Sequence, residues 1–485
     1  MTFADIRRSR IERWRLRGSL RRAVANFLSG EYTAEQRLAG TAFIIRVASA
    51  GIVFTSQALI ARWIGSGEFG SYVYVWTCLL LASEVAHFGL PLTAQRFVPE
   101  YRETGSDDLL RGYLSGSQWL IFWVSLVIAL ASGLAIWHLR RHFDAQLIIP
   151  FLLACAALPA YALTFMSDGL ARSFNWIGLA LLPAYIVRPL AFVASITVLR
   201  VAGVGLDAAT VMATLVGAAW FAVAVQTFRL KSKLKQVTSP GSKRYAAKQW
   251  LATALPLVLV WGLYTLLTST DVVVLKQFRP AEDVAHYYAA AKIVAFVSMI
   301  YFSVAATTAH RFTALYVSDR RGELSRFASS TVRWIFWLSL VATTLLLIFG
   351  RWLLLLFGAD FAPAYPVMVI LAAGQLVRAS VGPAERVLNV LGQQRKCAIV
   401  YAAAFAFNIT TCLLLAPKYG AAGTAIATAG AFVIESLLLF MLVKYTLGLH
   451  MFVWDWRAAS ASRPPSEPIR VNQFPKSFIK RCNRL

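Results

Sequence analysis

Residues Leu59–Tyr72 read LIARWIGSGEFGSY, a short polar turn between two long apolar runs. A related pattern recurs at Val273–Tyr287, VVLKQFRPAEDVAHY, again between apolar runs. Each stretch has a basic residue, a turn, an acidic residue and a tyrosine, in that order. The matching residues are Arg62 and Lys276, Glu68 and Glu282, and Tyr72 and Tyr287. This repeat predicts two matching halves, and a chance likeness of two short turns is the alternative.

The composition places the chain among membrane proteins. Of the 485 residues, 58% are hydrophobic and only 15% are charged. A water-soluble domain of this length could not bury so many apolar side chains. The 48 Lys and Arg residues outnumber the 23 Asp and Glu residues, which could suggest a nucleic-acid partner. The basic residues, however, are abundant in every second loop, a pattern that sets the orientation of membrane proteins. We therefore expect no nucleic-acid partner.

The five cysteines show no CxxC or metal-ligand spacing, and the chain has no Walker, GxSxG or HExxH sequence. We expect no metal, no disulfide, no cofactor and no enzymatic active site. The chain is expected to move a substrate rather than to convert it.

Apolar runs of spanning length predict twelve transmembrane helices. In the first half the runs lie at 40–64, 69–93, 116–138, 146–168, 177–200 and 207–228. In the second half they lie at 249–275, 285–309, 331–357, 362–390, 397–416 and 421–446. The expected fold class is an all-α polytopic membrane protein, with two pseudo-symmetric six-helix bundles around a central cavity.

The segments between and beyond the bundles are basic. We expect an N-terminal segment at 1–39, bundles at 40–228 and 249–447, a hinge loop at 229–248 and a tail at 448–485. The nine arginines of the first segment suit either a helix on an anionic leaflet or a tail without fixed structure. About 36 Lys and Arg residues lie on the side of the termini and about eight on the other, which predicts cytoplasmic termini.

Ionisable residues inside apolar spans mark candidate sites, because they are costly unless they face a cavity or a partner. The cations predicted to line the cavity and bind substrate are Arg46, Arg188, Lys292 and Arg378. The residues predicted either to couple transport to an ion gradient or to neutralise those cations are Glu84, His87, Asp271, Glu385 and Glu435. Arginine forks hold phosphate well, so the predicted cargo is an anion.

The tenth span carries the clearest polar pattern. Its polar residues recur every three or four positions, which predicts one polar stripe along a continuous helix. The stripe consists of Gln375, Arg378, Gly382, Glu385 and Asn389. Either a water-filled cavity or ion pairing across helices would keep this face away from lipid.

A family resemblance rests on four stretches. ALIARWIGSGEFGSYVYVWTCLLLASEVAHFGLPLTAQRFVPEY at Ala58–Tyr101 resembles the start of the Wzx-like polysaccharide flippases of the multidrug/oligosaccharidyl-lipid/polysaccharide exporter superfamily. The stretches that follow in the family's order are TDVVVLKQF (Thr270–Phe278) with YYAAAKI (Tyr287–Ile293), LFGADFAPAYPVMVIL (Leu356–Leu371) and NITTCLLLAPKYGAAGTAIAT (Asn408–Thr428). The resemblance covers roughly residues 40–447.

The resemblance implies a flippase that moves undecaprenyl-diphosphate-linked oligosaccharide across the bacterial inner membrane by alternating access. Its product would serve exopolysaccharide, capsule or O-antigen biosynthesis. The implied partners are this polyprenyl-diphosphate-linked oligosaccharide, membrane lipids, and polysaccharide polymerase and chain-length proteins.

The first span also resembles the matching helix of the related lipid II flippases. The shared stretch, IIRVAS at Ile44–Ser49, implies that Arg46 meets the diphosphate, while Ile52 stands where those relatives have a second arginine. Two alternatives to the flippase remain open. One is a cation-coupled small-molecule antiporter of the same superfamily, and the other is a non-transporting membrane partner of a polysaccharide assembly complex.

Overall fold

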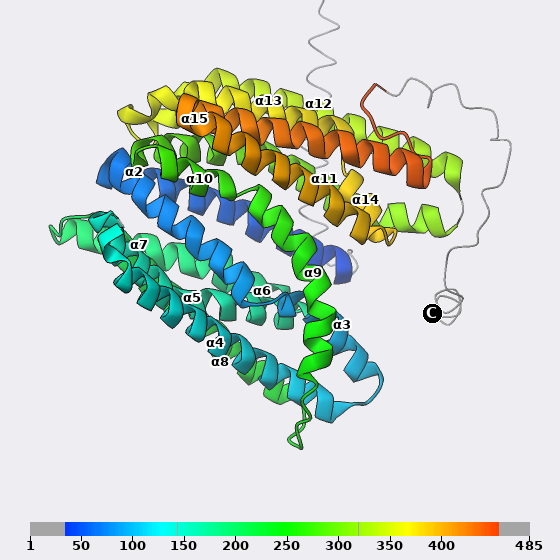
Figure 1. Cartoon of the computed structure of the whole chain (residues 1–485). Coiled ribbons are helices and arrows are strands. Elements are labelled where there is room, and N and C mark those ends of the chain that lie inside the picture. Colours follow the sequence, from blue (N-terminus) through cyan, green and yellow to red (C-terminus); the bar gives the residue numbers. More distant parts are fainter. Residues whose placement is uncertain (1–33, 143, 319, 455–485) are drawn as a thin grey trace, which may run out of the picture.

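The structure is a computed structural model that describes residues 34–142, 144–318 and 320–454, and every regular element in these ranges is helical (Figure 1). In the first half these elements are α2 (Ala34–Ala86), α3 (Leu90–Glu103), α4 (Asp107–His138), η1 (Arg140–His142), α5 (Ala145–Ser173), α6 (Ile177–Leu182), η2 (Pro183–Val187), α7 (Arg188–Val201) and α8 (Ala208–Val237). In the second half they are α9 (Ala247–Leu267), α10 (Thr270–Phe278), α11 (Ala281–Val317), α12 (Arg321–Leu355), η3 (Ala359–Ala364), α13 (Tyr365–Val381), α14 (Ala384–Val390) and α15 (Gln394–Leu447).

The two basic end segments lie mostly outside the described residues. Of the segment expected at 1–39, the structure describes 34–39, which begin α2. Of the tail expected at 448–485, it describes 448–454.

Two long helices each contain two passes. Gly65 interrupts α2 with φ 79° and ψ 169°, and Gly420 interrupts α15 with φ 57° and ψ −135°. A positive φ is readily adopted only by glycine. Figure 1 shows that α2 and α15 each turn back along their length, so that each helix has two arms. Gly65 lies in the stretch that the sequence repeat singles out.

The passes number twelve within the described part of the chain. Nine helical segments there are long and apolar enough to cross a membrane. Two of the nine contain two passes each, and α9 with α10 supplies one more. The predicted fold class, an all-α membrane protein with two six-helix bundles, is therefore confirmed.

The halves touch at both ends of the passes. We call the end where α2 begins and α15 finishes the terminal end, and the other the opposite end. At the terminal end, Trp250 Nε1 of α9 donates a hydrogen bond to the Tyr101 hydroxyl of α3 at 3.1 Å. At the opposite end, Gly70 of α2 lies against the backbone of Ala281 in α11. The two polar turns that resemble each other in sequence therefore meet in the fold.

The tenth pass differs from the continuous helix that its sequence predicts. It is not a continuous helix, because α13 ends at Val381 and α14 begins at Ala384. Gly382 between them has φ 64°, and Pro383 lacks the N–H that a continuing helix would use. The predicted polar stripe is thus divided, with Arg378 on α13 and Glu385 on α14.

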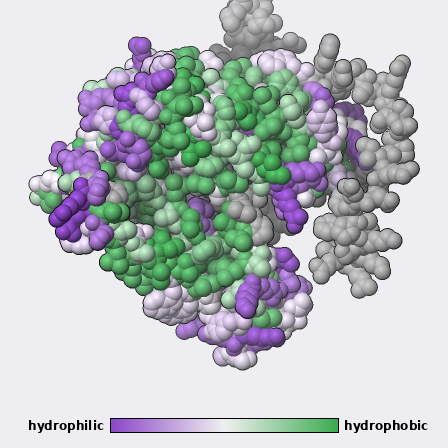
Figure 2. Space-filling view, viewed as in Figure 1, coloured by the Kyte–Doolittle hydropathy of each residue, from purple (hydrophilic) through white to green (hydrophobic). Residues whose placement is uncertain are grey.

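Large apolar side chains cover the outside of the described helices. Examples that are more than half exposed are Trp119, Val127, Leu134, Trp334 and Ile348. Figure 2 shows hydrophobic residues in a broad band across the molecule, with hydrophilic residues gathered toward its margins. A protein in water does not expose so much contiguous apolar surface. The chain is therefore a multi-pass membrane protein.

Candidate functional site

The pass formed by α6, η2 and α7 is irregular near its middle. In the π-helical turn η2, the backbone N–H of Arg188 donates to the carbonyl of Pro183, five residues back. Pro183 and Pro189 lack the N–H groups of a regular helix, which favours this wider turn. π-turns are frequent at functional sites. This one directs Arg188 toward α5, because its guanidinium lies over the Tyr161 ring at 4.4 Å from the centroid.

A small cavity of about 50 Å³ adjoins Arg188 inside the first half. Gln57 and Tyr72 are almost fully buried and bring an amide and a hydroxyl to its wall. The remaining lining residues are Val53, Ser56, Trp76, Tyr161, Pro189, Phe192 and Leu215. Arg188 is only partly exposed, so the guanidinium lies in a largely aromatic and apolar setting.

Lys292 belongs to the second half and lies close to Trp76, which also lines this cavity. Its Nζ atom lies 4.8 Å from the centroid of Tyr288 and 5.6 Å from that of Trp76. Trp76 Nε1 donates a hydrogen bond to the Tyr161 hydroxyl at 3.2 Å. We call Arg188, Lys292, Trp76 and Tyr161 the Arg188–Lys292 site. Among the described side chains, no carboxylate lies within 4.0 Å of either cation.

Arg46 lies apart from this site. It is exposed, and its guanidinium lies 5.9 Å from the ring centroid of Tyr185 in η2. Near the terminal end of α5, Arg172 donates two hydrogen bonds to Asp168 at 2.8 and 2.9 Å. Both residues fall at or beyond the end of the predicted span, so the sequence does not mark this pair as buried charges.

Arg378 belongs to a separate cluster in the second half. Its Nη2 atom lies 3.1 Å from Oε1 of Glu435, and the two side chains are 8% and 1% exposed. Aromatic rings surround the guanidinium, with centroids at 5.6 Å for Tyr264, 5.6 Å for Tyr301 and 5.4 Å for Phe432. Arg378 therefore has a buried counter-ion at 3.1 Å, whereas no described carboxylate comes within 4.0 Å of Arg188 or Lys292.

Asp271 forms the centre of a buried network between four passes. Tyr287 of α11 donates a hydrogen bond to Oδ2 of Asp271, at the start of α10. The Thr428 hydroxyl lies 3.3 Å from the same oxygen and 3.0 Å from the Tyr287 hydroxyl. Asn408 Nδ2, on the other arm of α15, donates to Thr428 at 3.4 Å. All four side chains are less than 5% exposed, so this acid is satisfied by neutral groups.

The other predicted acids interact within their own segments. His87 Nδ1 accepts a hydrogen bond from the N–H of Gly89 at 3.2 Å, so its Nε2 carries the proton toward Glu84 Oε2, 3.1 Å away. Glu385 accepts a hydrogen bond from Asn389 Nδ2 at 3.3 Å on the same short helix. The structure therefore divides the nine predicted residues among several places.

The neutral members of these clusters are not among the site residues that the sequence predicts. Trp76 and Tyr161 carry no signal in the sequence, because aromatic residues are common in apolar spans, and Tyr287 stands out only as part of the repeat. Asn408 and Thr428 lie one on each side of the Gly420 turn, and their position inside apolar spans was the available signal. Within the described residues, no group of three or more His, Cys, Asp or Glu side chains is placed to hold a metal ion.

Comparisons with known proteins agree with this architecture. A family model described as polysaccharide biosynthesis protein matches residues 38–310, which is more than half of the chain. A second family model, MatE, matches residues 256–414. The comparison with curated proteins gave no match.

Among solved structures, an inward-facing multidrug resistance MATE family transporter of the MOP superfamily has a TM-score of 0.69 at 12% identity, covering 87% of this chain and 100% of its own. The lipid II flippase MurJ, in an inward closed conformation, has a TM-score of 0.65 at 15% identity, with coverages of 83% and 87%. A MOP superfamily transporter from Pyrococcus furiosus Vc1 has a TM-score of 0.60 at 13% identity, with coverages of 85% and 95%. At these identities the likeness shows the fold alone. The chain therefore belongs to the polysaccharide biosynthesis protein family and has the fold of the MOP superfamily, which includes the Wzx-like flippases.

Proposed function

We propose that the protein is a flippase that carries undecaprenyl-diphosphate-linked oligosaccharide repeat units across the bacterial inner membrane, for exopolysaccharide, capsule or O-antigen biosynthesis. The observation that carries the proposal is the Arg188–Lys292 site, where each half supplies a cation that has no carboxylate of the described residues within 4.0 Å. A diphosphate that leaves water needs charged donors in place of its hydration. Family membership supports the same class of cargo.

The origin of the two cations suggests how binding and release would alternate. Arg188 belongs to the first half and Lys292 to the second, and the Trp76–Tyr161 hydrogen bond lies between them. A rocking motion of the halves would change the distance between the cations and therefore the affinity for a diphosphate. Cation–π attraction would hold the cations in place while the site is empty.

Arg46 and Arg378 take different positions in this proposal. Arg46 is exposed next to η2 and would meet the diphosphate before the Arg188–Lys292 site does. Arg378 would contribute only if Glu435 released it, because the two side chains are paired and buried.

Among the acids, we propose Asp271 for ion coupling. It is buried, it lies where four passes meet, and it accepts hydrogen bonds from the hydroxyls of Tyr287 and Thr428 and from the backbone N–H of Val272. A proton gained or lost there would change the hydrogen bonds that join α10, α11 and both arms of α15. The ion gradient would then drive transport by changing the packing of helices in the second half.

Variants of the Arg188–Lys292 site test the proposal. In a strain that lacks the native gene, Arg188→Gln and Lys292→Gln should each lower export of surface polysaccharide at least about tenfold and raise inner-leaflet lipid-linked precursor, because each removes a charged donor. Arg188→Lys should be partly impaired, because it keeps the charge but not the fork. Arg200→Gln, an exposed residue of the same helix, is the matched control. Normal export by both Gln variants at normal abundance would refute the proposal.

A cation-coupled small-molecule antiporter is the second candidate, and the MatE match over residues 256–414 favours it. The two candidates differ in cargo charge. Uptake of organic cations into inverted vesicles that depends on Asp271 but not on Arg188 would favour the antiporter. Accumulation of lipid-linked precursor in the deletion strain would favour the flippase.

A further inference from the structure

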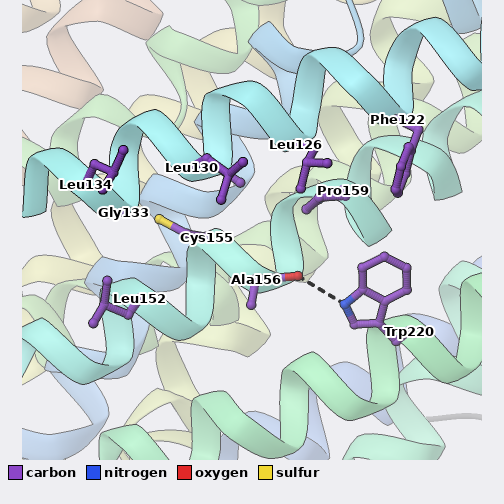
Figure 3. A pocket seen from close by; sticks show the side chains of 11 residues that line it. Phe122, Leu126, Leu130, Gly133, Leu134, Leu152, Cys155, Ala156, Pro159 and Trp220 are labelled. Atoms are coloured by element: carbon purple, nitrogen blue, oxygen red, sulfur yellow. Dashed lines mark hydrogen bonds between the residues drawn. The ribbon is translucent and has the colours of Figure 1, made fainter. Parts of the chain in front are cut away.

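A second cavity lies on the first half, between α4, α5 and α8, with a volume of about 410 Å³ (Figure 3). This volume falls within the range of roughly 300–1,000 Å³ that is typical of ligand pockets. Small residues create the space, since Ala129 and Gly133 line it from α4 and Ala156 from α5. We call this cavity the α4–α5–α8 groove.

The groove faces away from the second half. On α5, Phe151 packs against Tyr74 of α2, and Tyr161 accepts its hydrogen bond from Trp76 of α2, whereas Ala156 lies on another side of the helix and is exposed. The wall residues Leu130 and Leu134 on α4 are 59% and 70% exposed. The groove therefore opens toward the hydrocarbon of the membrane and not toward the Arg188–Lys292 site.

The groove offers nothing to a polar ligand. Trp220 supplies the polar side-chain group in its wall, and the indole N–H already donates to the carbonyl of Ala156 at 3.0 Å (Figure 3). The rest of the lining is aliphatic, aromatic or a thiol. A polar group placed there would lose its hydration without compensation. The occupant that fits is a hydrocarbon chain.

Basic residues near one end of the groove indicate where the headgroup of a bound lipid would lie. Beyond Leu134, α4 continues to His138 and is followed by the exposed turn Arg140–His142. At 1.5 Å per residue, Arg140 is about 9 Å farther along than Leu134, which brings it to the membrane surface at the opposite end. Its guanidinium lies over the Trp137 ring at 4.5 Å from the centroid. Interfacial tryptophan and arginine forks for phosphate are features of lipid headgroup sites.

We infer that the α4–α5–α8 groove binds an anionic phospholipid of the leaflet at the opposite end, with an acyl chain in the groove and the phosphate at Arg140 and Arg141. The phospholipid would fill the space that the small residues leave and would join three helices of the first half. The inference rests on the placement of these helices in the membrane and is independent of the proposed function.

Native mass spectrometry of the full-length protein in detergent tests the inference with two probes, dioleoyl phosphatidylglycerol and dioleoyl phosphatidylcholine, which share their chains and differ in headgroup charge. Wild type should retain phosphatidylglycerol in preference to phosphatidylcholine. Gly133→Leu should lower retention of both about tenfold, since it displaces at least two chain methylenes. The Gly133 Cβ position has only Leu152 near it, at 3.9 Å, so the backbone need not move. Arg140→Gln with Arg141→Gln should abolish the preference but keep the chain-dependent binding.

Gly217→Leu is the matched control, because Gly217 is exposed on α8 with nothing within 4 Å of its Cβ position and does not line the groove. It should retain lipid as wild type does. Ala156→Leu fills the groove from α5 and replaces Gly133→Leu if that variant fails to fold. Retention that both filling variants leave unchanged, or a preference that survives loss of both arginines, would overturn the inference. Displacement of phosphatidylglycerol by an equal concentration of undecaprenyl phosphate would also overturn it and assign the groove to the cargo lipid.

Discussion

Gly70 in α2 and Ala281 in α11 meet so closely that a Cβ atom at position 70 would lie 1.7 Å from the carbonyl oxygen of Ala281. Beside this contact, Phe69 packs against Tyr288 and Phe361 of the second half, with ring centroids 6.0 Å away in both cases. The halves are therefore closed at the opposite end by a backbone approach that requires glycine.

Gly70→Ala should hold the halves apart at the opposite end, because the added methyl group would overlap backbone that cannot rotate away. We expect a longer distance between spin labels attached at exposed Arg62 and Glu282, and reduced transport. Gly51→Ala in the same helix is the control, since nothing lies within 4 Å of its Cβ position. An unchanged label distance in Gly70→Ala would show that the contact does not set the closed arrangement.

The pair formed by Arg378 and Glu435 should contribute mainly to stability. Arg378→Gln leaves a buried carboxylate unpaired, which typically costs about 3–5 kcal/mol, and the thermal unfolding midpoint in detergent should fall accordingly. The double variant Arg378→Gln with Glu435→Gln should recover much of this loss, because neither charge remains. If Arg378→Gln instead abolishes transport with an unchanged midpoint, Arg378 acts on the substrate.

Asp271→Asn should uncouple transport from an imposed pH gradient in proteoliposomes. Asparagine keeps the shape and can accept the hydrogen bond from Tyr287, but it cannot exchange a proton. Glu385→Gln is the control, because Glu385 is partly exposed and is bonded to Asn389 on its own helix. A response of Asp271→Asn to the gradient that equals the wild-type response would exclude Asp271 from coupling.

Asp207 should make the start of α8 sensitive to acid. Its Oδ1 atom accepts hydrogen bonds from the Thr210 hydroxyl at 2.6 Å and the Thr210 N–H at 2.7 Å, and these bonds lower the pKa of the Asp207 carboxyl. The stabilisation is present above the unfolded pKa of about 3.9 and is lost as pH falls through the lower folded value.

Asp207→Ala should therefore cost about 1 kcal/mol at pH 7, as loss of a helix cap does, and less below pH 3. Unfolding midpoints of wild type and Asp207→Ala, measured side by side at both pH values, check this. A difference that does not change with pH would mean that the carboxylate charge is not what caps α8.

The sequence by itself determined the class and the number of passes. Spanning length is a local property, so it predicts twelve passes without any knowledge of packing. The break of the tenth pass was also visible as Gly382-Pro383, but the three-to-four-residue spacing from Gln375 to Asn389 favoured a continuous helix. The repeat of Leu59–Tyr72 at Val273–Tyr287 predicted related turns, though not that they touch.

Only the tertiary structure decided which polar and charged side chains are neighbours. Trp76 and Tyr161 are 85 residues apart in the chain, and Tyr287 and Thr428 are 141 apart, yet each pair is within hydrogen-bond distance. In water, a polar face tells which way a helix is turned. In a membrane, the lipid-facing and core-facing sides are both apolar, so the sequence leaves the rotation and pairing of each helix open. Packing between helices settles both. It pairs Arg378 with Glu435, whereas no carboxylate of the described residues lies within 4.0 Å of Arg188 or Lys292.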